Sequence, residues 1–305
     1  MMNLWTSLNP PRRRFLLLSP VVLLLLGGMV LPMVIMAIAS FSGAADYGGV
    51  LWGKFSAAAY AQFLFEQDFS DQLVFNSDYL LIFLRSFQLA LVTTLGCFLL
   101  GFPTALFIAS RPIQYRNILL ILVSIPFWTN LLVRIYAWIA LLRDGGIIEQ
   151  LLHHLRIITA PSLGLMYTNT ATEIGLLYAF LPFMVLPIYA SLARLDWRLV
   201  DAAHDLGANG WQVLRRIIIP LALPGIISGC TLVFVPALGM YIIPNLLGGS
   251  KFLMIGNLVH LQFTNAHNWP FGAALSFVLL GLALLGILMR RVYFIKAGEH
   301  TREHA

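Results

Sequence analysis

Long apolar runs, separated by short polar segments, dominate this chain. Stretches of about 20 apolar residues are long enough to cross a bilayer as helices, and the pattern predicts about six of them. Because an open sheet could not satisfy its backbone hydrogen bonds in lipid, the fold class expected is all-α, an integral membrane helical bundle. The expected spans are Phe15–Phe41, Tyr79–Ser110, Asn117–Leu142, Ala171–Arg194, Arg216–Asn245 and Pro270–Phe294.

Composition agrees with this pattern. Hydrophobic residues make up 59% of the chain and charged residues only 10%, against about 25% charged in a typical soluble domain. The first apolar run follows Arg12–Arg14 and contains Ala37-Ile38-Ala39, so it superficially resembles a cleavable signal peptide. It is longer than the usual apolar region of about 7–15 residues in such peptides. We therefore expect an uncleaved first helix.

The net charge of +6 follows the expected topology and gives no reason to expect nucleic acid as a partner. With the N-terminus inside, thirteen basic residues fall in cytoplasmic segments. The outer loops hold four: Lys54, Arg143, Arg156 and Lys251. This bias follows the positive-inside rule and predicts that both termini are cytoplasmic.

A polar segment from Asp201 to Pro220 interrupts the apolar pattern. Asp196 is suited to cap a short helix, because its carboxylate can accept from free backbone N–H groups. Gly207 follows the last apolar position, where a left-handed residue would end that helix. One helical face is apolar, through Leu199, Ala203 and Leu206, and another carries Arg198, Asp201 and Asp205. The segment therefore predicts an exposed amphipathic docking helix.

The spacing in this segment is acidic-Ala-Ala, three residues, Gly207, nine residues, Ile217, one residue, then Ile219-Pro220. It resembles the EAA loop of binding-protein-dependent ABC importer permeases, with Asp201 for the usual Glu and Ile219 for the usual Leu. In that family the loop forms the cytoplasmic coupling helix that docks into the ATPase subunit. The resemblance implies a coupling role for Asp201, Ala202, Ala203, Gly207, Ile217 and Pro220.

Three further stretches resemble the PotB-type permease subunit of spermidine/putrescine importers: Pro126–Trp138, Leu181–Tyr189 and Met254–Ala274. The resemblance implies a type I (MetI-like) permease fold in the bacterial inner membrane, working by alternating access. It also implies a second permease subunit in a heterodimer, two ATPase subunits that bind ATP and Mg, and a periplasmic polyamine-binding protein. Membrane lipid would surround the spans.

The resemblance suggests a domain organisation. Residues 1–79 would form a cytoplasmic tail, the first transmembrane helix and a periplasmic loop. Residues 80–294 would form a five-helix permease core that carries the cytoplasmic coupling loop 195–220, and residues 295–305 a cytoplasmic tail.

Aromatic faces attract the ammonium groups of polyamines, so aromatic residues in the spans are candidates for the substrate pathway. Tyr241 is favoured, because Pro236–Pro244 is a segment broken by Pro and Gly, and broken helices are tolerated at membrane depth where they line a cavity. In one respect the chain departs from the family it resembles: members often carry an acid just after the Pro-Ala-Leu-Gly stretch or directly before Leu-Leu-Gly-Gly, where this chain has Met240 and Asn245. The pathway candidates are Trp128, Tyr136, Trp138, Tyr178, Tyr241, Asn245 and Trp269. The alternative is that the aromatic residues are interface anchors.

Asn130 and Arg134 are the clearest polar residues within a predicted span. Charge inside a membrane is costly and points to function by default. Because Arg134 would repel a polycation, we expect a structural role, in which it pairs with an acid or with helix-end carbonyls. Gly225 and Gly229 fit close helix packing.

Other chemistry finds little support in the sequence. Cys97 and Cys230 lie in predicted spans and are read as packing residues, and the histidines lack metal-ligand spacing. Gly248-Gly249-Ser250-Lys251 lacks the spacing of a phosphate-binding loop, so we expect no cofactor in this chain. The alternatives to a polyamine importer are a permease for another small polar solute and, from a different class, an integral-membrane enzyme or channel.

Overall fold

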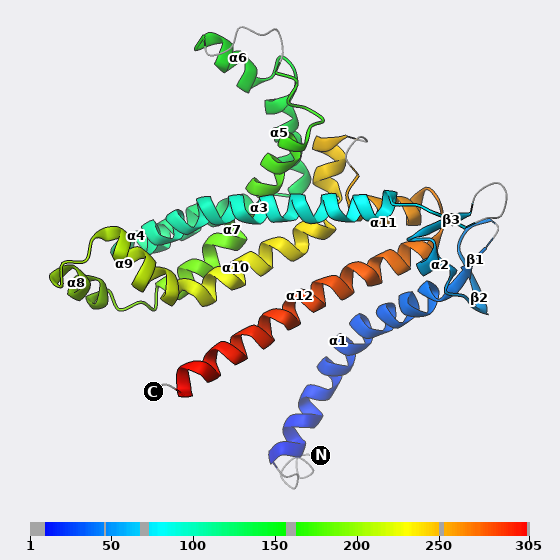
Figure 1. The fold of residues 1–305 in the computed structure, drawn as a ribbon, viewed down its shortest axis with the longest axis horizontal. Coiled ribbons are helices and arrows are strands. Elements are labelled where there is room, and N and C mark those ends of the chain that lie inside the picture. The colour runs from blue at the N-terminus through cyan, green and yellow to red at the C-terminus, as the bar shows by residue number, and fades with distance from the viewer. Residues whose placement is uncertain (1–9, 46, 68–72, 157–162, 250–252, 304–305) are drawn as a thin grey trace, which may run out of the picture. The chain divides into compact units, whose positions relative to one another are not determined.

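The computed structural model describes residues 10–45, 47–67, 73–156, 163–249 and 253–303 (Figure 1). The chain divides into two compact units. The first contains residues 1–76 and 261–281, and the second contains residues 77–260 and 282–305.

Five helices among the described residues are long and apolar enough to cross a membrane. This agrees with the helical membrane architecture expected from the apolar runs. The spans are Leu18–Ser40 in α1 (Pro10–Ser40), α3 (Asp78–Ala109), α7 (Asn169–Leu192), Gly210–Gly239, and Trp269–Leu288 in α12 (Trp269–Glu303).

The predicted third span is not straight. Helix α4 (Ile113–Ser124) and the 3₁₀ turn η2 (Ile125–Trp128) are followed by α5 (Leu131–Leu142) and α6 (Ile147–His154), with a bend of 89° after Trp128. A new helix begins after the bend, because the side chain of Asn130 accepts the backbone N–H of Leu132 at 2.9 Å and caps α5. Asn130 is therefore a helix cap at a break, and not a polar residue inside a continuous span.

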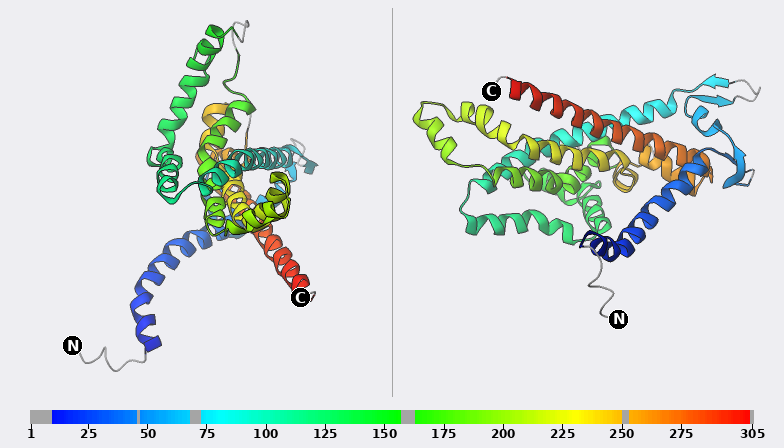
Figure 2. Two further views of the ribbon diagram at one scale, coloured as in Figure 1. Left: turned by 90° about the vertical axis from the view of Figure 1, so that its left-hand side faces the viewer. Right: turned by 90° about the horizontal axis from the view of Figure 1, so that it is seen from below.

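The second unit has its core where α3, α7 and α10 (Ile219–Gly239) pack together (Figure 1). Small residues allow this approach. A Cβ atom on Gly225 would lie 2.5 Å from the Pro187 carbonyl oxygen, and one on Gly229 would lie 2.8 Å from Met184 Sδ. The close packing expected at Gly225 and Gly229 is thus present. The short helices α8 (Arg198–Asp205) and α9 (Gly210–Val213) lie at one end of this bundle (Figures 1 and 2).

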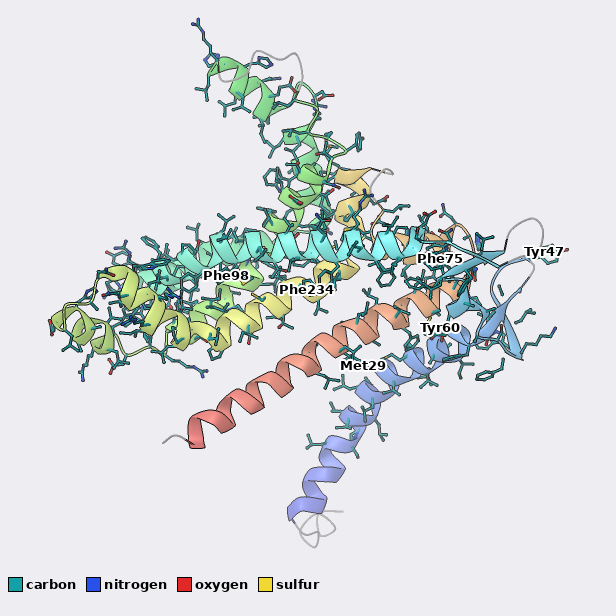
Figure 3. The ribbon with its side chains drawn as sticks, viewed as in Figure 1. Met29, Tyr47, Tyr60, Phe75, Phe98 and Phe234 are labelled. Atoms are coloured by element: carbon teal, nitrogen blue, oxygen red, sulfur yellow. The ribbon has the colours of Figure 1, made fainter. Side chains whose placement is uncertain are left out.

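The first unit contains small sheets as well as helices. Strand β1 (Ser42–Ala44) pairs antiparallel with β2 (Val50–Phe55), and β3 (Phe65–Gln67) with β4 (Leu73–Phe75). The four-residue α2 (Ala58–Ala61) follows β2. Gly49 donates its N–H to the His267 carbonyl at 2.8 Å, which fixes the first hairpin to the segment before α12. Tyr47, near the tip of that hairpin, points outward and is fully exposed (Figure 3).

Candidate functional site

Helix α8 starts the predicted coupling loop. Its N-cap is Trp197, and Asp196 lies one residue earlier. The sequence predicted Asp196 as the N-cap, and it lies one position before the observed one; its carboxylate still accepts the backbone N–H of Arg198 at 3.1 Å and so satisfies a free donor at the helix start. The beginning of the helix is therefore determined by residues within the loop.

Gly207 ends α8 in the left-handed conformation, with φ of +82°. The N–H of Gly207 donates to the His204 carbonyl at 2.9 Å, and the N–H of Ala208 donates to the Ala203 carbonyl at 3.0 Å. This pair of bonds is the Schellman motif, in which glycine is the preferred residue. A Cβ atom on Gly207 would meet nothing within 4 Å, so the position requires glycine for its backbone and not for space.

The loop then passes directly into α10. Asn209 and Gln212 form a reciprocal capping box, with bonds of 2.8 and 2.9 Å, at the start of α9. One turn of π-helix, η3 (Leu214–Ile218), follows. Pro220 has no N–H with which to continue the α-helical pattern, and Ile219 instead donates to the carbonyl of Leu214, five residues earlier. The result is one continuous helix from Gly210 to Gly239.

The coupling loop exposes large apolar side chains. Leu199, Leu206 and Trp211 are 51%, 88% and 67% exposed, in a segment that also exposes Arg198 and Asp201. Exposed apolar side chains on a polar element are the feature expected of a docking segment, and the docking role stays a prediction. Of the predicted coupling residues, Ala202, Gly207 and Pro220 are exposed, whereas Ala203 and Ile217 are half-buried.

The pathway candidates fall into separate groups. Trp138 on α5 and Tyr178 on α7 meet edge to face, with ring centroids 5.6 Å apart. Trp128 and Tyr136 are 79% and 60% exposed. Trp269 belongs to the first unit, where its ring centroid lies 6.4 Å from that of Phe263.

The expected pairing of Arg134 is wrong for the described residues. Its guanidinium carbon lies 5.6 Å from the centroid of the Phe127 ring, and its buried Nε has no hydrogen-bond partner in the described part of the chain. An aromatic face partly replaces the expected acid or carbonyls, because a ring attracts a guanidinium electrostatically. Phe127 in turn packs edge to face on Phe183, which couples the bend to α7.

Tyr241 lies where the fifth span breaks. Helix α10 ends at Gly239, Met240 is extended, and the π-helical turn η4 (Pro244–Gly248) follows, so the predicted break is present and the span ends before Asn245. The Tyr241 ring stacks on the ring of His260, with centroids 4.8 Å apart and planes at 19°. Asn245 is exposed and donates its backbone N–H to the Tyr241 carbonyl at 3.0 Å.

Two residues of α11 (Ile255–Thr264) contact this break and were not predicted from the sequence. Asn257 donates its side-chain N–H to the Tyr241 carbonyl at 3.1 Å, and His260 stacks on the Tyr241 ring. The polar Asn257 stands in an apolar run, which is the signal that the sequence offered for this contact. Its partner could not be identified from the sequence, because Tyr241 lies 16 residues earlier.

Similarity to known proteins covers most of the chain. Residues 99–294 match the family described as "Binding-protein-dependent transport system inner membrane component". The spermidine/putrescine transport system permease protein PotB of Escherichia coli K12 is 47% identical over 210 residues, which cover 68% of this chain and 76% of that protein. Its counterpart in Haemophilus influenzae is 43% identical over 221 residues, covering 72% and 76%.

Two further matches are more distant. The inner membrane ABC transporter permease protein YdcU of Escherichia coli K12 is 36% identical, covering 65% of this chain and 66% of that protein. A crystal structure of a bacterial ABC transporter involved in the import of the acidic polysaccharide alginate aligns with a TM-score of 0.65 at 16% identity, covering 95% of this chain and 98% of that one. At that identity the similarity concerns the fold.

Proposed function

The chain belongs to the family of binding-protein-dependent inner membrane transport components and is a permease subunit of an ABC importer, and we propose that its cargo is a polyamine. The observation that carries this proposal is 47% identity over 210 residues to a permease named for spermidine and putrescine. An importer of this class works with an ATPase and a substrate-binding protein.

The chemistry of the broken span supports a cationic cargo. Tyr241 is 38% exposed at the end of α10, where a helix presents the negative end of its dipole. An aromatic face and helix-end carbonyls together stabilise an ammonium group without a carboxylate. This offers a means of cation recognition although Met240 and Asn245 supply no carboxylate.

The coupling loop would be the contact with the ATPase. Leu199, Leu206 and Trp211 would enter the ATPase surface, while Asp201 and Arg198 would set the orientation. In this arrangement the small residues Ala202 and Ala203 permit close approach, and Gly207, Ile217 and Pro220 hold the loop on α10. Two ATPase subunits would bind ATP and Mg and carry out the hydrolysis.

A second permease subunit would complete the pathway. The described spans leave broad apolar faces exposed, for example Leu81, Leu84 and Leu95 on α3, which suit lipid or a partner helix. We expect a heterodimer in which the cargo moves between the two subunits by alternating access.

A different small polar solute is the second candidate, and the absence of an acid at Met240 and Asn245 favours it. The test is ATPase stimulation of the purified complex, with its binding protein, by spermidine, putrescine and a neutral solute of similar size. The polyamine proposal requires stimulation by spermidine or putrescine that exceeds the response to the neutral solute. Stimulation by the neutral solute alone would reject the polyamine cargo and retain the importer.

A further inference from the structure

Three residues in the first turns of α11 contact the end of α10 and the residues that follow it. Gly256 packs so closely that a Cβ atom there would lie 2.4 Å from the Gly239 carbonyl oxygen. The Asn257 side chain donates to the Tyr241 carbonyl at 3.1 Å, and one turn later His260 stacks on the Tyr241 ring. We call this contact of Gly256, Asn257 and His260 with Gly239 and Tyr241 the α10–α11 joint.

The joint contains an unsatisfied acceptor. Asn257 is only 6% exposed, and its Oδ1 is buried without a hydrogen-bond partner among the described residues. The bond from Nδ2 to the Tyr241 carbonyl establishes which end of the amide is the oxygen, because a carbonyl needs a donor. A buried amide oxygen without a partner destabilises a fold, and an apolar residue of the same size would avoid that cost. Such a group in a native protein calls for an explanation.

The surroundings of this oxygen suit a cation. A primary ammonium group has three N–H donors and no acceptor, so a free amide oxygen is its complement. Helix α10 ends at Gly239, where the dipole places partial negative charge, and the Tyr241 ring adds the attraction of an aromatic face. The oxygen lies close to the helix end, because the same amide donates to the Tyr241 carbonyl and the neighbouring Gly256 packs against Gly239.

We propose that Asn257 Oδ1 accepts an N–H from a cargo ammonium group, and that it becomes accessible when the α10–α11 joint opens during transport. The proposal rests on the polyamine cargo proposed above and adds a specific acceptor to it. Neutral oxygens at a helix end would then bind the ammonium group without a carboxylate at Met240 or Asn245. The cargo class is a flexible chain with primary ammonium ends.

Two substitutions distinguish the contribution of the Asn257 amide oxygen from that of its N–H donor. Asn257→Leu keeps the size and removes both groups, whereas Asn257→Asp keeps an acceptor and removes the donor. The matched control is Asn117→Leu, which makes the same change at an exposed position of α4. Each complete transporter, with both permeases, the ATPases and the binding protein, is reconstituted into liposomes. Uptake of labelled spermidine and the melting temperature of the complex are measured.

We expect Asn257→Leu to lower the initial uptake rate by about tenfold or more, the effect of one lost hydrogen bond to a charged group. Its melting temperature should be equal to that of wild type or higher, because the unsatisfied oxygen is gone. Asn257→Asp should keep uptake within about threefold of wild type, since a charged acceptor binds an ammonium group at least as well. Asn117→Leu should match wild type.

Other results would overturn the proposal. Wild-type uptake by Asn257→Leu would show that the oxygen does not contact the cargo. Loss of uptake together with a lower melting temperature in Asn257→Leu, or equal loss in Asn257→Asp at normal stability, would show that Asn257 acts only by holding Tyr241. A wild-type transporter that imports no polyamine would reject the cargo itself, so the two failures are distinguishable.

Discussion

The coupling loop and the α10–α11 joint lie before and after the same helix and are built in opposite ways. In the loop, polar groups find partners within a few residues: Asp196 bonds Arg198, Gly207 bonds His204, and Asn209 bonds Gln212. In the joint, Asn257 bonds Tyr241 across 16 residues and leaves its own oxygen without a partner. Local bonds give the loop a shape of its own, whereas the joint is a contact between two separate segments, and the proposal above requires that this contact opens. A docking surface requires the first property and a gate requires the second.

The largest effect should come from breaking the local shape of the loop. Gly207→Val places a β-branched residue at φ of +82°, a conformation that such residues avoid. We expect uptake and co-purification of the ATPase to fall about tenfold or more, because strain of about 1–3 kcal/mol is relieved by distorting the end of α8. Gly210→Val is the matched control, since neither glycine has an atom within 4 Å of its missing Cβ and only Gly207 has positive φ. Normal uptake and normal ATPase binding by Gly207→Val would contradict the coupling role.

The α10–α11 joint should be sensitive to added side-chain volume, whereas the coupling loop is sensitive to backbone conformation. Gly256→Ala adds a methyl group 2.4 Å from a backbone oxygen that cannot move away freely. We expect destabilisation of about 1–3 kcal/mol, with lower uptake and a lower melting temperature. Gly286→Ala in α12 is the control, because nothing lies within 4 Å of its Cβ position. Unchanged stability of Gly256→Ala would mean that the two segments are not tightly packed.

A milder change tests the aromatic face at the joint. Tyr241→Phe keeps the ring, and Tyr241→Ala removes it, so uptake should fall more in the alanine variant, by a factor that corresponds to up to about 2 kcal/mol. Both rates are compared per amount of assembled complex, because anchoring at the membrane interface would also favour Phe over Ala. Equal uptake rates for the two variants would remove Tyr241 from the pathway.

Cysteine labelling tests the topology, and the single-cysteine variants should transport as well as wild type. Single cysteines at Ser56, His153 and Asn265, in a background without Cys97 and Cys230, should react with an impermeant thiol reagent from outside. Cysteines at Gln114, Asn209 and Gly298 should not react, because the basic residues place these positions inside. External labelling at Asn209 would put the coupling loop on the wrong side for an ATPase.

Features with local causes could be predicted from the sequence. The apolar runs predicted the spans to within a few residues at most ends, and the residue types at Asp196 and Gly207 predicted how α8 begins and ends. The bend after Trp128 could have been inferred too, because Asn130 is a good N-cap in an apolar run; it was interpreted as a polar residue inside a span.

Features with distant causes could not be predicted. Arg134 faces the Phe127 ring instead of an acid, since the bend brings that ring to it. The contacts of Asn257 and His260 with Tyr241 could be identified only from the structure, in which α11 packs against the end of α10. Spacing along the chain contains no signal for a partner 16 residues away in a different helix. The roles proposed for the coupling and pathway residues stay predictions until the variants are measured.

The single turn of π-helix before Pro220 has a mechanical consequence. It lets the proline sit in the helix without interrupting it, so Gly210–Gly239 is one rod of 30 residues, about 45 Å long at about 1.5 Å per residue. Rotating such a rod by about 5° about one end moves the other end by about 4 Å. That displacement exceeds the length of the hydrogen bond between Asn257 and Tyr241. A tilt of this helix that starts at the coupling loop would therefore displace Gly239 by more than the contact between Asn257 and Tyr241 can follow.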